Sequence, residues 1–272
     1  MALCCEANAR YAYKCRRMGV RTYMNVNEIL ARRTDLSTFL VHLTRADTEE
    51  LTAEDSLASI LRSQVIEARN PFGMAADKLR SAGDDASSQN TVCFTETPLE
   101  NVNLLASAIE GRACQFAPYG IAITRRQARS LGVNPVWYLD ITPGHNWLTN
   151  PINTLVQTNI ENPGGDSRGI LEISPFMEQM GTRQQTGDGP GEQGYRKEFW
   201  WEREWRHVGN FSLPPRYIVL CPKRSIPALR GIIEELDEFA APNKYSFVDP
   251  MWSLEMIIGK LAGFSGSELG AF

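Results

Sequence analysis

The 272-residue sequence lacks the motifs that most readily identify metal-binding and nucleotide-binding proteins. None of its six cysteines forms a C-x-x-C pair, and no histidine lies at zinc-finger spacing from a cysteine. No G-x-G-x-x-G follows a predicted strand, and no G-x-x-x-x-G-K-[ST] is present. We therefore predict no metal site and no standard nucleotide-binding fold of either type.

Long apolar runs and an excess of positive charge are also missing. No segment has the apolar run of a signal peptide, and none approaches a membrane span. The formal net charge of -4 removes the argument for a generally basic nucleic-acid binder, so any polyanion would have to meet a local basic patch. The cysteines lie in apolar neighbourhoods that fit a reducing compartment. We expect a cytoplasmic protein with no membrane association.

What the sequence contains is typical of a globular domain, with 43% hydrophobic and 22% charged residues. The spacing of apolar residues and the positions of glycine and proline predict strands and helices that follow one another with several short strand-to-strand connections. We expect strands at 38–44, 91–97, 119–124, 135–141, 199–208 and 216–222, and helices at 26–33, 51–68, 98–111, 125–132, 225–239 and 250–264. Residues 168–176 fit a strand or part of a helix equally well. This order favours an α+β fold over a doubly wound parallel sheet.

The domain organisation follows from the same pattern. We divide the chain into an N-terminal helical extension (1–37), a central domain (38–222), and C-terminal helices (223–272) that pack on the central domain. The glycine-rich stretch within 181–196 predicts an exposed, mobile loop.

The predicted strand at 199–208 has an unusual mixture of tryptophan and charge. Side chains alternate along a strand, so Trp200, Glu202, Glu204 and Arg206 would share one face, with the two carboxylates roughly 6.5–7 Å apart. One interpretation is a solvated face on which Arg206 pairs with a glutamate. The other is a cleft in which a carboxylate beside an indole is partly desolvated for chemistry.

Two earlier strands carry polar side chains at the same alternate spacing. His42 and Thr44 share one face of the first strand, and Thr95 and Thr97 share one face of the second. Buried polar groups need hydrogen-bond partners, which a bound ligand can supply. A lone strand histidine is more often a satisfied core residue, and strand threonines are common, so each pair alone is weak evidence.

Taken together, the order His-x-Thr, Thr-x-Thr, Glu-x-Glu resembles the three motifs of the ADP-ribosyltransferase fold. "HLT" followed by "SLASILRSQVIEARN" is similar to the opening of DarT-type enzymes. "VCFTETPL", "YGIAITRRQARSLGVNPVWY" and "EREWR" resemble the AbiGi family of abortive phage-infection proteins and related toxin families. The resemblance spans about residues 38–210, and it implies a strongly bent or split mixed β-sheet flanked by helices.

The resemblance also implies roles for individual residues, with NAD as the ADP-ribose donor. Glu204 would stabilise the ribose cation, Glu202 would orient the acceptor, and Arg69 would serve the pyrophosphate or catalysis. The NAD-binding residues would be His42, Thr44, Thr95, Thr97 and Tyr119. A one-residue bulge would exchange the two glutamates, so which of them is essential stays open. The sequence departs from the pattern with "QVI" after the first helix and with Thr-Glu-Thr in the middle motif.

The predicted function is therefore that of an NAD-dependent ADP-ribosyltransferase toxin in anti-phage defence. DarT-type relatives modify nucleic acid, so the first choice of acceptor is single-stranded DNA or RNA, and a protein side chain is second. Phosphate contacts would come from Arg125, Arg126 and Arg196, and base stacking from Trp200. Such a toxin implies a neutralising antitoxin or chaperone partner. The alternatives are a non-catalytic interaction or antitoxin protein on the same scaffold, and a nuclease that uses the glutamate pair to bind a divalent metal.

Overall fold

The computed structural model describes residues 32–46, 51–107, 115–142, 146–162, 169–182, 196–197, 200–236 and 245–270. The chain divides into two compact units, Met1–Leu36 and Ser37–Phe272, and the fold described below is that of the second. The predicted helix at 26–33 and the predicted mobile loop lie almost entirely outside the described residues. The three-part division of the chain stays a prediction.

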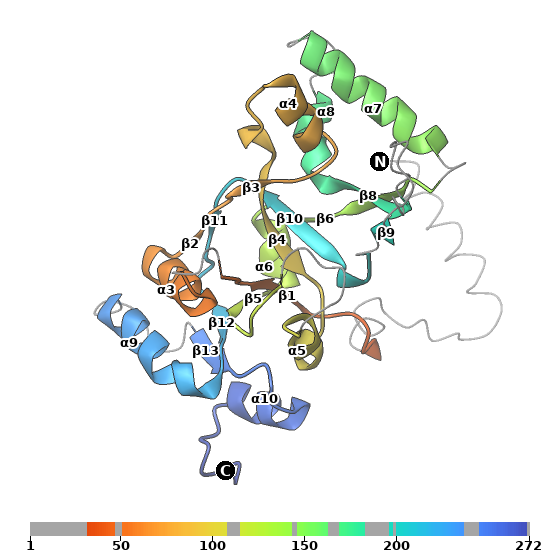
Figure 1. Ribbon diagram of the computed structural model, residues 1–272. Helices are drawn as coiled ribbons and strands as arrows, with labels where there is room; N and C mark the ends of the chain where they lie inside the picture. Colours follow the sequence, from red (N-terminus) through yellow and green to blue (C-terminus); the bar gives the residue numbers. More distant parts are fainter. Residues whose placement is uncertain are drawn as a thin grey trace, which may run out of the picture. The chain divides into compact units, whose positions relative to one another are not determined.

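A mixed β-sheet forms the centre of the second unit (Figure 1). Its strand order is β13-β12-β5-β1-β4-β10-β6, and the short strand β3 also pairs with β4. All neighbours are antiparallel except β12 and β13. The strands are β1 (Phe39–Leu43), β3 (Asn70–Pro71), β4 (Asn90–Thr95), β5 (Gly120–Thr124), β6 (Asn134–Pro135), β10 (Glu204–Val208), β12 (Tyr217–Leu220) and β13 (Tyr245–Val248). The architecture is α+β, and the ADP-ribosyltransferase-like fold stays a prediction.

Two smaller sheets lie beside the main one. Strands β2 (Val65–Ile66) and β11 (Phe211–Ser212) form an antiparallel pair. Strands β7 (Trp137–Asp140), β8 (Met177–Thr182) and β9 (Arg196–Lys197) form the other sheet, in which β7 and β8 are parallel.

The predicted helix at 51–68 is observed as α3 (Ala53–Ser63), and residues next to its two ends explain where it begins and stops. Thr52 and Asp55 form a reciprocal capping box at the start, which satisfies backbone N–H groups that have no partner within the helix. The chain leaves the helix at Gln64, whose φ of 54° is left-handed. The helix is therefore shorter than the predicted 51–68, because Val65 already belongs to β2.

The remaining helices are α4 (Ala76–Ala82), α5 (Val102–Leu105), α6 (Arg125–Ser130), α7 (Asn146–Glu161), α8 (Gly169–Ile173), α9 (Ile226–Leu236) and α10 (Leu254–Leu261), with 3-10 turns η1 (Ser87–Gln89), η2 (Leu99–Asn101), η3 (Ser174–Phe176), η4 (Trp200–Glu202) and η5 (Lys223–Ser225). Of these helices, α5, α6, α9 and α10 lie within predicted helical segments, whereas no helix was predicted at α4 and α7. Residues 169–176 are helical, which settles the ambiguous segment. No helix in the described ranges combines the length and apolar character needed to cross a bilayer.

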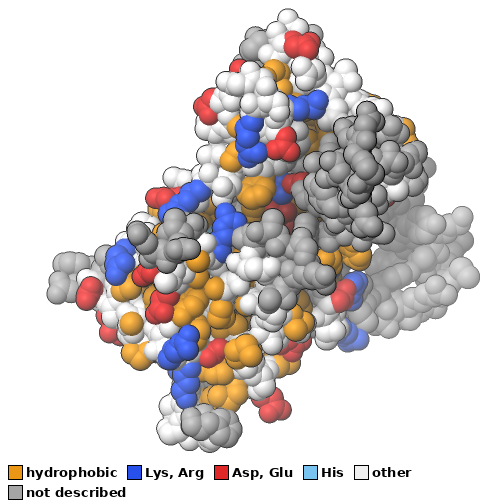
Figure 2. Space-filling model, viewed as in Figure 1, with side chains coloured by type: hydrophobic (Ala, Val, Ile, Leu, Met, Phe, Trp, Pro, Cys, Tyr) orange, Lys and Arg blue, Asp and Glu red, His pale blue; other side chains and the backbone are white. Residues whose placement is uncertain are grey.

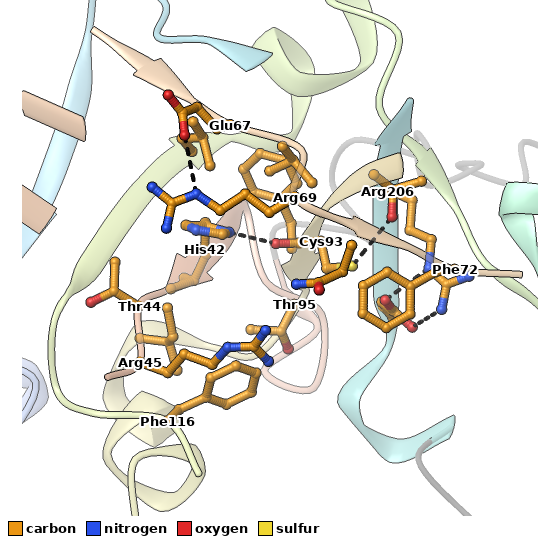
Figure 3. Close-up of a pocket in the computed structure, with 18 of the residues that line it drawn as sticks. His42, Thr44, Arg45, Glu67, Arg69, Phe72, Cys93, Thr95, Phe116 and Arg206 are labelled. Carbon is orange, nitrogen blue, oxygen red and sulfur yellow. Dashed lines mark hydrogen bonds and ion pairs between the residues drawn. The ribbon is translucent and has the colours of Figure 1, made fainter. Parts of the chain in front are cut away.

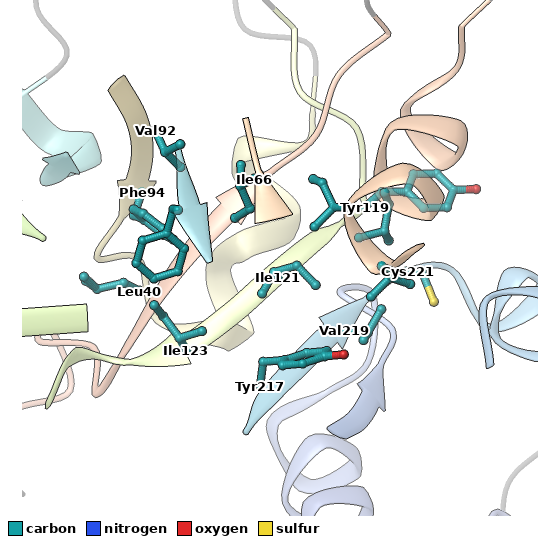
Figure 4. Close-up of a cluster of buried hydrophobic side chains, with 14 of the residues drawn as sticks. Leu40, Ile66, Val92, Phe94, Tyr119, Ile121, Ile123, Tyr217, Val219 and Cys221 are labelled. Atoms are coloured by element: carbon teal, nitrogen blue, oxygen red, sulfur yellow. The ribbon is translucent and has the colours of Figure 1, made fainter. Parts of the chain in front are cut away.

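Apolar side chains from alternate strand positions fill both faces of the main sheet. One face packs against α3 and α9 through residues that include Leu40, Phe94 and Ile121 (Figure 4). The opposite face buries Val41 and Leu43 with side chains from α5 and α10. A third cluster joins α4, α7 and α8 to β7 and β8. The second unit is therefore stabilised by burial on both sides of one sheet.

The predicted strand at 199–208 is wrong over its first half. Trp200–Glu202 form the 3-10 turn η4, and β10 begins only at Glu204. Arg203 separates them with a φ of 49°, a left-handed conformation that interrupts strand alternation. Trp200 and Glu202 therefore do not share a strand face with Glu204.

Two glycine-to-alanine substitutions test the close approach of β1 and β5. A Cβ on Gly120 would lie 2.2 Å from the His42 carbonyl oxygen, so Gly120→Ala must displace backbone and should cost about 1–3 kcal/mol in the free energy of unfolding. Gly231 lies within α9 with nothing in the path of an added methyl group, so Gly231→Ala should stabilise by about 0.4–1 kcal/mol. Urea unfolding measures both. Equal stability of the two variants would contradict the strand register.

Candidate functional site

A cavity of about 510 Å³ opens where β1 and β4 part. Along the edge of β4 that faces β1, Asn90 and Thr91 pair with β3, and Thr95 pairs with Val41 of β1. The middle of β4 therefore has no strand beside it on that edge, and the cavity occupies this part of the sheet. Its walls also include the serine-bearing side of α3 and parts of β2, β7 and β8.

His42 bridges the gap between the two strands. Its Nδ1 lies 2.8 Å from the Cys93 carbonyl oxygen, and its ring meets the Phe94 ring edge-on (Figure 3). Because a carbonyl only accepts, Nδ1 carries the proton, and Nε2 of the neutral ring is an acceptor. Burial lowers the pKa of His42 below 6.5, and the charge of Arg45 lowers it further against the opposing effect of the Cys93 carbonyl. His42 is therefore neutral near pH 7.

Thr44 and Tyr119 have mainly structural contacts. Thr44 lines the cavity, but its buried hydroxyl donates to the Ala53 carbonyl at 2.8 Å, and thereby fastens the start of α3 to the end of β1. Tyr119 does not line the cavity. Its ring lies in the core (Figure 4). Its hydroxyl donates to Glu54 and contacts Ser225. Tyr119 was predicted to bind NAD, and the structure places its ring outside the cavity lining, in the core between α3 and α9.

Thr95 and Thr97 of the middle motif hold the turn that carries Glu202. Thr95 donates its hydroxyl proton to the Glu202 backbone carbonyl at 2.6 Å, and Thr97 lies 2.8 Å from the Thr95 hydroxyl. Since Thr95 has used its only proton, Thr97 must be the donor in the second contact. Thr95 lines the cavity, whereas Thr97 is not a lining residue and contacts the cavity wall only through the Thr95 hydroxyl.

Glu96, between these threonines, is a buried residue that the sequence did not single out. Its carboxylate accepts from Arg125 at 2.6 Å, from Trp205 Nε1 at 3.0 Å and from Arg203 at 3.4 Å. Its backbone N–H also donates to the Arg203 carbonyl. Glu96 therefore stabilises the left-handed conformation of Arg203. Glu96 is the residue by which Thr-Glu-Thr departs from the expected middle motif, and this contact is its role in the fold.

Of the substrate-binding residues proposed from the sequence, Arg125, Arg126 and Trp200 are not among the residues that line the cavity. Arg125 forms the ion pair with Glu96, and Arg126 is exposed on α6. Trp200 is 55% exposed on η4, and Arg196 belongs to β9. On the face shown in Figure 2, acidic and basic side chains are interspersed rather than gathered into one basic patch. Their predicted contacts with nucleic acid remain predictions.

Arg206 forms the most buried charged cluster of the cavity wall. Its Nε and Nη2 each lie 2.9 Å from one Glu204 oxygen, in a bidentate pair. Nη2 also donates to Glu178 at 2.8 Å, Nη1 donates to the Pro175 carbonyl at 2.7 Å, and the guanidinium lies over the Phe72 ring. With 1% of the residue exposed, Arg206 joins β10 to η3 and β8.

Two further arginines and aromatic rings line the same cavity. Arg69 pairs with Glu67 at 3.1 Å near the cavity mouth, and Arg45 extends toward Phe116 and Thr95 (Figure 3). Guanidinium groups bind phosphate oxygens well, and aromatic rings accept flat ligand rings. The lining therefore suits a ligand that combines aromatic rings with negative charge.

Tyr138 adds a polar group to the wall near the glutamates. Its hydroxyl is buried and forms no well-aligned hydrogen bond with the described residues. Burial, followed by the charge of Glu204, raises its pKa, so the phenol keeps its proton. Cys93 behaves in the same way, because burial and then Glu204 raise the pKa of its thiol. Neither residue was predicted from the sequence.

The glutamate pair does not form a metal site in the structure. Both Glu204 oxygens accept from the Arg206 guanidinium, which occupies the position that a bound cation would take. Within the described residues, no three His, Cys, Asp or Glu side chains are grouped as metal ligands would be. The nuclease alternative stays a prediction.

Comparison with known proteins yields one relationship. A family model described as "Putative abortive phage resistance protein AbiGi, antitoxin" matches residues 58–225, more than half of the chain. This range runs from within α3 to the end of η5, so it includes β4 and β10 but not His42. No curated protein and no solved structure matches the chain.

Removal of the Arg206 guanidinium tests its role as the anchor of the cavity wall. Arg206→Met leaves Glu204 and Glu178 without their buried cation and should cost about 3–5 kcal/mol in the free energy of unfolding. The control Arg80→Met breaks an exposed pair with Asp77 and should cost less than about 1 kcal/mol. Urea unfolding measures both values. Similar losses in the two variants would contradict the assigned role.

The lowered pKa of His42 predicts a pH dependence of stability. As pH falls below 6.5, histidine protonates in the unfolded chain while His42 stays neutral in the fold. The unfolded state then binds more protons, so the contribution of His42 is present above pH 6.5 and is lost as pH falls toward its folded pKa. Urea unfolding between about pH 7.5 and 5.5 should show a steeper loss for the wild type than for His42→Gln. Parallel curves would contradict the burial of a neutral His42.

Proposed function

We propose that this chain, which belongs to the family of the putative abortive phage resistance protein AbiGi, transfers ADP-ribose from NAD in defence against phage. The family suggests a role in anti-phage abortive infection. The enzymatic activity rests on the candidate site.

The observation that carries the proposal is the convergence of three distant motifs on one cavity. His42 from β1, Thr95 from β4 and both Glu202 and Glu204 line the same space. In the sequence, these residues were selected as the His-x-Thr, Thr-x-Thr and Glu-x-Glu elements of an ADP-ribosyltransferase. Their meeting in one cleft is what that assignment requires.

The cavity also has a composition that suits a dinucleotide substrate. Its volume of about 510 Å³ lies within the range of about 300–1,000 Å³ of small-molecule sites. NAD carries a pyrophosphate, which Arg45 and Arg69 suit, and two flat rings, which Phe116 suits.

The proposed reaction is displacement at the ribose carbon that bears nicotinamide. The bond between this carbon and the nicotinamide nitrogen breaks, and nicotinamide leaves with the bonding electrons. Positive charge then develops on the ribose, where a carboxylate stabilises it by electrostatic complementarity. An acceptor oxygen or nitrogen forms the new bond to the same carbon and gives up its proton. His42 is neutral and hydrogen-bonded to the sheet, so its task is to bind and orient the donor.

Single-stranded nucleic acid is the proposed acceptor. Trp200 is exposed on the turn that ends in Glu202, so an unpaired base stacked on the indole would lie close to the cavity. With a net charge of -4, phosphate contacts would come from local arginines such as Arg126. A neutralising protein partner is part of this proposal.

A second candidate is favoured by the word "antitoxin" in the family description. The chain would then bind and neutralise a partner toxin without turning over NAD. Exposed aromatic side chains such as Trp147 and Trp200 would suit a protein interface. This candidate gives no role to the arginine- and glutamate-lined cavity, so we place it second.

Incubation with NAD labelled in its adenylate part tests the proposal. The wild type should release nicotinamide and transfer label to single-stranded RNA or DNA oligonucleotides or to a lysate component. Glu202→Gln/Glu204→Gln should reduce both signals by at least about 10²–10³-fold, because neither carboxylate of the pair then remains to stabilise the developing charge. The control Glu234→Gln changes an exposed glutamate of α9 and should retain full activity.

The alternatives give different results in the same assay. A folded wild type that neutralises a toxin and releases no nicotinamide would contradict the proposal and support the binding role. Cleavage of nucleic acid that needs magnesium and not NAD would support a nuclease.

A further inference from the structure

We infer that a surface formed by α6 and the turn η4 binds the phosphates and one unpaired base of a single-stranded nucleic acid. Its residues are Arg125, Arg126 and Arg129 of α6, Trp200 of η4, and Arg203 directly after η4, and we call it the α6–η4 surface. The inference rests on the proposed acceptor and deepens it, because it names where the acceptor docks.

One buried carboxylate holds two of these arginines in place. Glu96 accepts from Arg125 at 2.6 Å and from Arg203 at 3.4 Å, and its own side chain is almost fully buried. The side chains of Arg125 and Arg203 are 24% and 41% exposed. One negative charge therefore holds two guanidinium groups that are partly open to solvent, so the three side chains together carry a net positive charge. Because the ion pairs already restrict both arginines, less conformational entropy is lost when they bind an anion.

Helix α6 adds further positive charge beside this cluster. It contains three arginines and no acidic residue. Arg129 follows Arg125 by four residues and therefore lies on the same side of the helix, and both Arg126 and Arg129 are exposed. The capping box of Thr124 and Gln127 already satisfies backbone groups at the start of α6, so the arginine side chains are the groups that would contact phosphate.

The turn η4 connects this charge to the cavity. The Arg203 backbone N–H donates to the Trp200 carbonyl at 3.1 Å, so the exposed indole and the Arg203 guanidinium belong to one turn. Glu202, in the same turn, lines the cavity. A base stacked on Trp200 would therefore bring its neighbouring phosphates to Arg203 and the strand to the cavity.

The combination of groups favours a single strand over other anionic partners. Proteins that bind single strands use positive charge along the backbone and aromatic side chains on which unpaired bases stack. The bases of a duplex are stacked on one another and do not offer a free face to Trp200. The net charge of -4 means that the rest of the chain does not supply a general attraction for polyanions. Binding should therefore depend on these few arginines.

Fluorescence anisotropy of a labelled single-stranded RNA of about 12 nucleotides, measured with the full chain over a series of salt concentrations, tests the phosphate contacts. Arg126→Gln/Arg129→Gln changes two exposed side chains, so the fold should be kept. Its Kd should rise by about tenfold or more at low salt, and the slope of log K against log salt concentration should fall by about 1.4, because each contact with single-stranded phosphate contributes about 0.7. The control Arg224→Gln/Arg230→Gln removes the same charge from exposed positions in η5 and α9 and should leave the slope unchanged.

The indole is tested in the same assay. Trp200→Ala should raise Kd for the single strand by about 5–100-fold with the salt slope unchanged, because stacking releases no counterions. Trp200→Phe keeps an aromatic face and should restore most of the affinity. For a blunt duplex of the same sequence, Trp200→Ala should have no effect.

The outcomes separate this inference from the proposed function. Equal losses in the two double variants would show that overall charge is responsible and would overturn the α6–η4 surface. A folded wild type that binds no single strand would also overturn it, and release of nicotinamide with label transfer to a protein would then leave the transferase standing. If strand binding follows the predictions and no nicotinamide is released, the proposed transfer falls and the surface stands.

Discussion

The candidate site depends on one feature of the main sheet, the incomplete pairing between β1 and β4. These strands share only the Val41–Thr95 pair, and β3 takes the other end of the β4 edge. Between them, the His42 imidazole hydrogen-bonds to the Cys93 carbonyl, where a continuous ladder would have supplied a backbone donor. The sheet is thus open to a ligand while its exposed backbone acceptor is satisfied. Because His42 makes this bond in a half-buried position, its neutral state is part of the fold as well as of the site.

Two buried ionic clusters, one at Arg206 and one at Glu96, stabilise the part of the fold that carries Glu202 and Glu204. The two clusters join different segments. Arg206 joins β10 to η3 and β8, whereas Glu96 joins β4 to the turn at Arg203 and to α6. Desolvation of such charges is expensive, and apolar side chains of similar volume often stabilise a fold equally well. What an ionic cluster adds is direction, because bidentate and multiply bonded groups fix neighbouring segments at defined distances. Here the segments so fixed are those that carry Glu202 and Glu204.

The sequence predicted the elements better than it predicted their orientation. Strands such as β1, β4, β5 and β12 follow from short β-branched runs, and the start of α3 follows from the capping residues Thr52 and Asp55. The three-motif pattern also selected His42, Thr95, Glu202 and Glu204, which line one cavity. Three features had no local signal: the left-handed Arg203, the inward direction of Tyr119, and the pairing of β13 with β12. Each of these features depends on contacts between residues far apart in the chain. The hydrophobic periodicity of the sequence predicts helices and strands and carries no information on such contacts. Glu96 was missed for the same reason, since its partners become visible only when β4 and β10 lie side by side.

The arrangement of charge in the cavity also bears on whether this chain acts as an enzyme or only binds a partner. A surface that neutralises another protein needs shape and a few exposed anchors, and such contacts lie on the outside of the fold. This chain also has charged side chains in a cavity, where Arg206 pairs with Glu204 and Glu178, and Arg69 pairs with Glu67. Fixed charges in a partly desolvated cleft act strongly on a substrate that carries charge of both signs. NAD has this character, with anionic phosphates and a cationic nicotinamide ring. The set of arginines and glutamates that lines one cavity is therefore the feature that a binding role leaves unexplained and that ADP-ribosyl transfer would use.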